Sequence, residues 1–352
     1  MCAALLSRSL LLALAVCAGP AAAADFGGWG RLMRITFSGY ARPEPLTNFP
    51  ALVLLGANIP GFRYSDFLSG SNADLRFADA GLSNALDYEI ETWDTNGISC
   101  VWVRVPRLEG TNTAVWALWG KPGVSAPECT TNGAVWSNGY GAVLHMAGTN
   151  TFDSSPYRHA VTNWGATNAP GICGPALGFS GSSSLRMGDV VNPSSITLSA
   201  WIRWNSAVGD GTYNCPVGKV NSYELVITRG TRVLWWAHSR NWAINNTTFL
   251  VTPGQWAHLV LAYDQNSGTR VYANAEQVGS ASTTGPLVCA GMLGAGVRGD
   301  GWGYWGGVID ELHISTVPRG SNWVWACYMN TASNAAFCRL DPIVTGTVVV
   351  VR

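Results

Sequence analysis

Apolar and polar residues alternate over short stretches along most of the chain, and glycine or proline ends many of these stretches. In Ile196–Trp204, the apolar residues Ile196, Leu198 and Ile202 share one face, whereas Thr197 lies on the other. This two-residue period is typical of a half-buried strand. Similar strands are expected at 32–37, 51–55, 100–105, 114–119, 223–228, 232–237, 256–263, 270–273 and 308–314. Helical spacing of apolar residues is nearly absent, so the pattern predicts an all-β protein built from β-sandwiches.

The strand pattern weakens once, near residues 121–143, and this break divides the chain. Lys121-Pro122-Gly123 closes the first set of strands, and the stretch that follows is rich in Thr, Asn, Gly and Ser. We therefore expect a first sandwich at 25–122, a linker at 123–143, a second sandwich at 144–330 and a tail at 331–352. The apolar strand Thr345–Val351 in the tail is expected to pair with a sheet edge, its own or a partner's.

The first 24 residues have the organisation of a secretion signal. Arg8 supplies a positive charge, residues 9–16 are apolar, and Ala22-Ala23-Ala24 provides small residues at a cleavage site. This predicts export to the cell surface, the periplasm or the medium. A lipoprotein signal ending at Cys17 is the alternative, although Val16 is bulky where a small residue is expected. No later segment has the length of a membrane-spanning helix.

Charge and composition restrict the partners further. Lys and Arg together number 21, as do Asp and Glu, and charged residues make up only 12% of the chain. This balance gives no basic surface for nucleic acid or for an anionic membrane. The chain has 17 Trp against 11 Tyr and 10 Phe, and a surplus of Trp favours a binding surface.

Nine cysteines are present, and seven remain after Cys2 and Cys17 are removed with the signal. In an exported protein these cysteines can form disulfides, and the odd number leaves at least one thiol free. The connectivity stays open at this point. Cys327 and Cys338 are closest in sequence and would clip the tail.

Several ordered motifs in the first half resemble one known family. These motifs are Asp74–Asp79 (DLRFAD), Leu86–Trp93 (LDYEIETW), Val101–Pro106 (VWVRVP), Val135–Tyr140 (VWSNGY) and Val143–Met146 (VLHM). Over roughly residues 27–146 the chain is similar to the DUF2341 family of bacterial exported proteins. That family has no settled activity, so the resemblance implies a β-sandwich and export without naming a function.

A second set of motifs, at residues 144–330, resembles the LamG-like family of concanavalin A-type jelly rolls. The motifs are Phe152–Ser155 (FDSS), Ala176–Gly181 (ALGFSG), Ile196–Trp204 (ITLSAWIRW), Pro253–Leu259 (PGQWAHL) and Gly307–Ile314 (GVIDELHI). The resemblance implies a two-sheet sandwich that binds sugars or proteins outside the cell. One departure is the hairpin Asn274-Ala275, where the family has Asp-Gly or Asn-Gly, because alanine tolerates positive φ less well than glycine. Gly306 also replaces an acidic residue of the family.

Asp310-Glu311 invites comparison with glycosidases of the same fold, which need two carboxyl groups facing each other. Neighbouring residues of a strand point to opposite faces, and the same-face neighbours of Asp310 are Val308 and Leu312. No nucleophile motif was found either. The sequence therefore predicts a protein that is not an enzyme, with glycoside hydrolysis as the less favoured alternative.

Asp310 has a second interpretation, as a ligand of one structural calcium ion. The first and last strands of a jelly roll lie close together, which would bring Asp153 near Asp310. Carboxylates are suitable ligands for calcium, but a site needs several oxygens and only these two are apparent. The alternative is that Asp153 caps a turn and Asp310 hydrogen-bonds a neighbouring loop.

Aromatic residues outside the expected core are the candidate ligand-binding residues. Trp235 and Trp236 are neighbours in an expected strand, so one of the two rings points away from the core. Trp242 lies in a polar, Asn-rich loop. Trp302 and Tyr304 lie in a glycine-rich loop before residue 307. Such rings stack against the flat faces of sugars, although packing is the commoner role of any single Trp.

These observations favour a secreted or cell-surface, non-catalytic binding protein. Its expected ligand is a polysaccharide or surface glycan, recognised through loop aromatics of the second domain. A structural or adhesive envelope protein that binds other proteins is the alternative.

Overall fold

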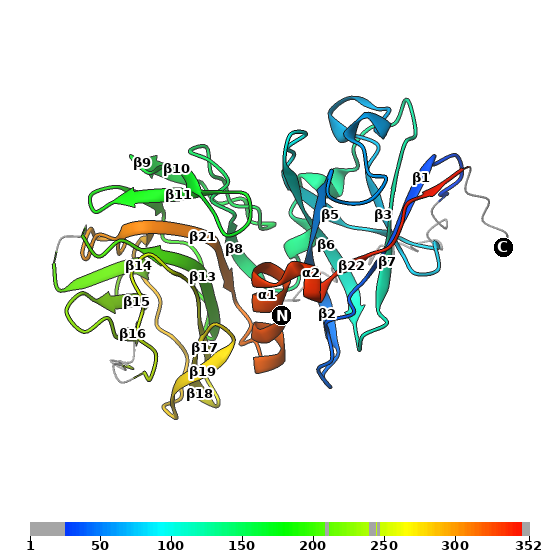
Figure 1. Cartoon of the computed structure of the whole chain (residues 1–352). Helices are drawn as coiled ribbons and strands as arrows, with labels where there is room; N and C mark the ends of the chain where they lie inside the picture. The colour runs from blue at the N-terminus through cyan, green and yellow to red at the C-terminus, as the bar shows by residue number, and fades with distance from the viewer. Residues whose placement is uncertain (1–24, 208–210, 239–243, 245–246, 347–352) are drawn as a thin grey trace, which may run out of the picture.

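The computed structural model describes residues 25–207, 211–238, 244 and 247–346 (Figure 1). Strands dominate these residues and helices are few, so the prediction of an all-β fold is confirmed. The strands form four antiparallel sheets, two in each domain.

The first domain packs a larger sheet against a three-stranded one. The larger sheet has the order β22-β1-β7-β3-β4, with β23 also paired to β1. Its strands are β1 (Arg31–Thr36), β3 (Arg76–Asp79), β4 (Ala85–Leu86), β7 (Ala114–Trp119), β22 (Arg339–Leu340) and β23 (Val344–Thr345). The smaller sheet, of order β2-β6-β5, consists of β2 (Leu46–Gly56), β5 (Tyr88–Thr92) and β6 (Ile98–Leu108). Apolar side chains from both sheets share one core, which includes Ile35, Val53, Val101 and Trp119.

The second domain is a sandwich of an eight-stranded and a six-stranded sheet. The larger sheet has the order β10-β11-β21-β13-β17-β18-β19, with β8 paired to β21; the smaller has the order β16-β15-β14-β20-β12-β9. The larger sheet comprises β8 (Tyr140–Leu144), β10 (Thr167–Pro170), β11 (Pro175–Ser180), β13 (Ile196–Trp204), β17 (Trp256–Asp264), β18 (Gly268–Ala273), β19 (Glu276–Ala281) and β21 (Gly306–Ser315). The smaller comprises β9 (Thr162–Trp164), β12 (Ser184–Met187), β14 (Tyr213–Lys219), β15 (Tyr223–Thr228), β16 (Leu234–His238) and β20 (Leu293–Ala295). The core between them contains Leu198, Trp204, Trp236 and Trp305.

The hairpin between β18 and β19 has the positive φ angles that alanine tolerates poorly, as expected from the Asn274-Ala275 sequence. Asn274 and Ala275 have φ of 50° and 70°, respectively. Positive φ at both central residues is the geometry of a type I′ turn, and its second position here is held by a residue with a Cβ.

The segment after β21 returns to the first domain. Helix α1 (Ser321–Ala332) and the short α2 (Asn334–Phe337) lie at the junction of the two domains (Figure 1). Trp323 of α1 packs in the core of the first domain, whereas Val324 packs with Val260 and Tyr272 on the outer face of the larger sheet of the second. The expectation that helices are nearly absent missed α1, because a helix with both sides covered shows no single apolar stripe.

The residues of the expected linker, 123–143, carry packed structure. It contains the 3-10 turns η3 (Glu128–Thr130) and η4 (Ala134–Trp136), in which Trp136 is fully buried, and the start of β8. Two further turns, η1 (Tyr64–Asp66) and η2 (Gly70–Asn72), lie in the first domain. In the tail, β23 pairs with β1 of the same chain, while residues 347–352 lie outside the described part. None of the helices among the described residues has the length and apolarity needed to cross a membrane.

Candidate functional site

An open groove lies beside the six-stranded sheet of the second domain. Its volume is about 630 Å³. Strand β9 contributes Trp164, β12 contributes Arg186 and Met187, and the segments before β20 and β21 contribute Met292 and Tyr304. The remaining lining residues are small or carry hydroxyls: Ala160, Thr162, Ser182, Ser184 and Gly188. The groove therefore combines two aromatic rings and two methionines with hydroxyl and guanidinium donors.

The aromatic residues of the groove are accessible. Trp164 is 65% exposed, and Tyr304 is partly exposed. An exposed Trp in a strand leaves a large apolar ring in water, which costs free energy unless a ligand covers it. Trp164 was missed from the sequence, and the signal that would have found it is its position in the polar stretch Thr162-Asn163-Trp164-Gly165.

Arg186 is fixed in place by the loop that precedes β21. Its Nε donates to Ser184 Oγ at 3.1 Å, and its Nη1 donates to the backbone carbonyls of Arg298 and Gly299. A guanidinium held by three acceptors loses little entropy when it binds a further group. The groove thus has a preorganised cationic donor next to its apolar surfaces.

Of the four aromatic residues predicted to bind ligand, the structure describes the side chains of two. Tyr304 lines the groove, whereas Trp302 lies outside its lining and packs 5.7 Å from the ring of Tyr213. The guanidinium of Arg298 also lies 4.7 Å from the Trp302 ring. Trp235 belongs to β16, but its side chain lies outside what the structure describes, and Trp242 lies outside the described residues altogether. The ligand-binding roles of Trp235 and Trp242 therefore stay predictions.

The two carboxylates predicted to hold calcium have separate sets of partners. Asp153 accepts hydrogen bonds from the backbone N–H of Val143 and Ser155, both at 2.9 Å, and from the N–H of His159 at 3.0 Å. Asp310 accepts from the N–H of Ile172 at 2.8 Å. The contacts of both carboxylates correspond to the turn-capping and loop-anchoring alternatives, and a calcium ion there stays a prediction.

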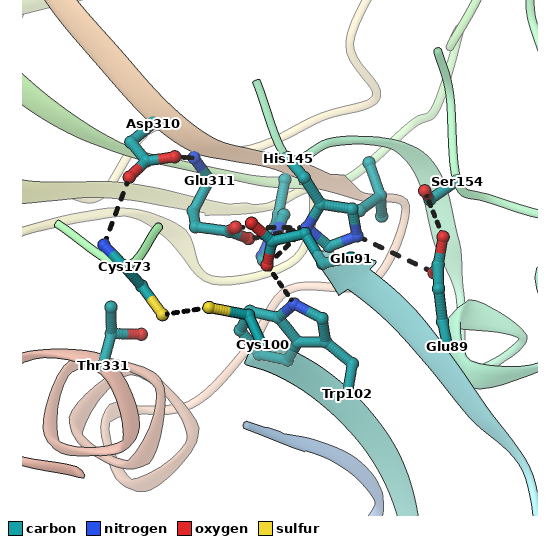
Figure 2. Close-up of polar contacts among 12 residues, drawn as sticks. Glu89, Glu91, Cys100, Trp102, His145, Ser154, Cys173, Asp310, Glu311 and Thr331 are labelled. Carbon is teal, nitrogen blue, oxygen red and sulfur yellow. Dashed lines mark hydrogen bonds and ion pairs between the residues drawn. The ribbon is translucent and has the colours of Figure 1, made fainter. Parts of the chain in front are cut away.

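A second, buried cluster lies where β5 of the first domain faces β21 of the second (Figure 2). Glu89 and Glu91 of β5 both direct their carboxylates toward His145. His145 Nδ1 lies 3.0 Å from Glu311 Oε2, which also lies 2.8 Å from His313 Nε2. His145 further lies 3.7 Å from the carboxylates of both Glu89 and Glu91. This interdomain cluster, Glu89, Glu91, His145, Glu311 and His313, was not found from the sequence.

An irregularity in β21 explains why strand parity failed here. Between the pairs Ser199–His313 and Trp201–Asp310, β21 carries one residue more than β13. Glu311 lies in this bulge with φ of 47°. A bulge interrupts the alternation of faces, so Asp310 and Glu311 both turn toward the junction and are both buried.

Burial and neighbouring charges shift the acidities of this cluster in opposite directions. Burial raises the pKa of Glu91 well above its ordinary value, and the negative charge of Glu311 adds to the rise. For Glu311, burial by itself would raise the pKa, but the charge and hydrogen bond of His145 outweigh burial and lower the pKa to about 2. For His145, burial by itself would lower the pKa, but the charge and hydrogen bond of Glu311 outweigh burial and raise the pKa well above its ordinary value. The cluster therefore contains a charged His145–Glu311 pair beside a carboxyl group that resists ionisation.

Comparison with known families confirms the two resemblances in the predicted order. Residues 71–143 match the model of DUF2341, a domain of unknown function, and residues 179–324 match that of the concanavalin A-like lectin/glucanases superfamily. A comparison with curated proteins gave no match.

Solved structures similar to this chain include one domain of an extracellular enzyme and the binding domains of two other proteins. Domain 4 of an extracellular arabinanase from Geobacillus stearothermophilus, in complex with arabinotriose, is 19% identical, with a TM-score of 0.43 over 53% of this chain and 96% of its own. The binding domain of Paraclostridial Mosquitocidal Protein 1 is 15% identical, with a TM-score of 0.44 over 54% and 52%. The binding domain of botulinum neurotoxin DC, in complex with SialylT, is 14% identical, with a TM-score of 0.42 over 54% and 51%. This chain thus spans about half the length of the two toxin binding domains, and similarity at this level identifies no ligand for it.

Proposed function

We propose that the chain is an exported, non-catalytic carbohydrate-binding protein that holds a polysaccharide or surface glycan in the groove beside β9, β12 and β20. The observation that carries the proposal is the pairing of the exposed ring of Trp164 with Tyr304 in one open groove. Sugar rings present flat C–H faces that pack on aromatic rings, and their hydroxyls need polar partners close by.

The polar side chains of the groove meet that second requirement. Thr162 and Ser182 offer exposed hydroxyls, and Arg186 offers a positioned guanidinium. These groups donate to and accept from sugar hydroxyls without requiring a charged ligand. A volume of about 630 Å³ falls in the range of small-molecule sites, so the groove has room for more than one sugar ring.

Binding without hydrolysis is favoured by the acid–base chemistry available in this part of the chain. The described lining of the groove includes no Asp or Glu, and glycosidases need a pair of them. The carboxylates of the interdomain cluster are buried and belong to the junction. Glycoside hydrolysis would therefore require a carboxylate pair outside the groove.

A glycan and polysaccharide array with the purified chain tests the proposal. Trp164→Ala removes a ring whose burial under a sugar contributes roughly 1.5–3 kcal/mol to the free energy of binding. The affinity of this variant for the glycan is therefore expected to fall by about ten- to a hundredfold. Tyr304→Ala is expected to weaken the same ligands. Tyr157→Ala is the matched control, because Tyr157 is 66% exposed and lies outside the groove. If no glycan binds, or if Trp164→Ala binds as the wild type does, the proposal is wrong.

A further inference from the structure

We propose that the interdomain cluster is a binding site for a divalent transition-metal ion, with zinc as its occupant. The ligands are His145 Nδ1, His313 Nε2 and a carboxylate oxygen of Glu311, and Glu91 completes the set from the first domain. This site is separate from the glycan groove and does not depend on the proposed function. Its role is to join the two domains.

The ligand atoms already have the spacing of a small coordination sphere. The donor atoms of His145, Glu311 and His313 all lie within 4.8 Å of one another. The separations from Glu311 Oε2 are 3.0 Å to His145 and 2.8 Å to His313, and Glu91 Oε2 lies 3.7 Å from His145 Nδ1. Bonds of about 2.0–2.1 Å in a tetrahedral zinc site place ligand atoms roughly 3.3 Å apart. The three separations given above each differ from this spacing by about half an ångström or less.

An unpartnered buried oxygen supplies independent support. The side chain of Glu91 is 0% exposed, and its Oε1 has no hydrogen-bond partner. A buried carboxylate oxygen without a partner is costly, and such atoms in folded proteins call for an occupant. Its other oxygen, Oε2, accepts a hydrogen bond from Trp102 Nε1 at 2.8 Å, which fixes the carboxylate toward His145 (Figure 2).

The residue types of the cluster suit a cation. Three carboxylates, those of Glu89, Glu91 and Glu311, face the imidazoles of His145 and His313. Among the described residues, the recorded ion pairs of these carboxylates involve histidine and neither Lys nor Arg. Zinc binding would displace the protons that the metal-free cluster holds, leaving Glu91 and Glu311 ionised and both imidazoles neutral, which is the state in which these groups bind metal.

The surroundings of the ligands also suit a metal centre. Glu89, whose Oε2 lies 3.7 Å from the Nε2 of His145, is itself held by Trp136 Nε1 and Ser154 Oγ, both at 2.6 Å. A carboxylate near the far nitrogen of a ligating histidine raises its basicity; at 3.7 Å Glu89 acts on His145 through its charge and not through a hydrogen bond. A cavity of about 130 Å³ lined by Glu89, Glu91 and His145 provides an entry path.

Elemental analysis and zinc titration of the chelator-treated full chain test this site. We expect one zinc per chain in the wild type. Glu91→Gln keeps the shape of the side chain but loses the ligand charge, so zinc affinity is expected to fall by at least about tenfold. Glu109→Gln, at an exposed carboxylate outside the cluster, is the control and should bind like the wild type.

His313→Gln provides a second variant, with cobalt(II) as a spectroscopic probe that does not depend on stability. The wild type should show the visible bands of four-coordinate cobalt(II), and His313→Gln should lose them. A wild type that takes up no zinc would overturn the proposal. Zinc that binds equally in wild type, Glu91→Gln and His313→Gln would also overturn it, because the ion would then lie elsewhere.

We further infer, from a different contact, that Cys100 and Cys173 form a disulfide between the two domains. Cys100 lies on β6, Cys173 lies between β10 and β11, and their Sγ atoms are 3.0 Å apart (Figure 2). Both are buried, and Cys100 Sγ is positioned as the more acidic thiol, because its hydrogen bond with Cys173 lowers its pKa. This pair replaces the sequence expectation of Cys327 with Cys338 as the first candidate.

The reaction needs an oxidant, and a disulfide exchange partner supplies it. The two thiols lose two protons and two electrons, which reduce one donor disulfide to two thiols. The test refolds the purified chain with glutathione disulfide, so it does not depend on export. Mass spectrometry of the alkylated, unreduced chain should show a linked peptide pair containing Cys100 and Cys173. Cys338→Ser should keep this link, whereas alkylation of both Cys100 and Cys173 in the oxidised wild type would overturn the inference.

Discussion

Replacement of Lys219 by methionine is predicted to destabilise the second domain strongly. The Lys219 side chain is 0% exposed, and its ammonium donates three hydrogen bonds: to Asp189 Oδ1 at 2.7 Å, to the Val190 carbonyl at 2.9 Å and to the Gly291 carbonyl at 2.7 Å. The two segments that it joins flank Met187, Gly188 and Met292 of the groove. Methionine fills a similar volume but donates nothing, so both carbonyls lose a charged donor.

The expected magnitude follows from those three bonds. Each carbonyl left without its donor costs roughly 1–1.5 kcal/mol, because both belong to partly buried residues. Asp189 is 54% exposed on its side chain and regains water, so the loss of the ion pair adds little. The two carbonyls together account for about 2–3 kcal/mol, or roughly 4–12 °C in the midpoint of thermal unfolding for a domain of this size.

Urea unfolding followed by circular dichroism measures this loss, with Lys121→Met as the matched control. Lys121 Nζ donates to one carbonyl, that of Gly27, and the residue is partly exposed, so its replacement should cost less than about 1 kcal/mol. If Lys219→Met unfolds within about 1 kcal/mol of the wild type, the three bonds do not hold the two segments together and the reasoning fails.

Three further predictions concern backbone strain and pH. Gly296→Ala should lower the free energy of unfolding by more than about 2 kcal/mol in urea, because φ is +76° and a Cβ would lie 2.1 Å from Phe179. Ala275→Gly should raise it by roughly 0.5 kcal/mol in the same assay, since φ of 70° strains alanine; a loss of stability would contradict the turn geometry. Burial, with a smaller effect of the His313 charge, lowers the pKa of His258 to about 3, so its stabilising contribution is complete above its ordinary pKa of 6.5 and is lost as pH falls toward 3. From pH 7 to pH 5 the wild type should therefore lose roughly 2 kcal/mol more than His258→Gln, and equal losses would show that His258 is not buried as a neutral ring.

The sequence predicted those elements that one strand or one family motif determines by itself. Ile196–Trp204 is β13 with the same ends, and residues 114–119 and 223–228 are β7 and β15. In each, the alternation of faces reflects burial on a sheet whose outer side differs from its core side. Both family resemblances, which depend on ordered motifs, were also confirmed.

Features formed by two segments that are distant in the sequence could not be predicted from local patterns. Helix α1 is covered from both domains, so its apolar residues follow no single stripe. The interdomain cluster depends on a bulge at Glu311 and on β5 of the other domain, and neither alternation nor spacing reveals such a meeting. Of the groove, Tyr304 was predicted from its glycine-rich loop, whereas Trp164 was missed because its stretch looked like a polar connection.

The most direct test of the carbohydrate-binding proposal is a crystal structure of the chain with the strongest glycan ligand of the array. We predict one sugar ring packed on the exposed indole of Trp164, with Tyr304 beside it and sugar hydroxyls bonded to Arg186 or Ser182. A glycan bound at another surface, with the Trp164 ring still in solvent, would contradict the assignment of the groove.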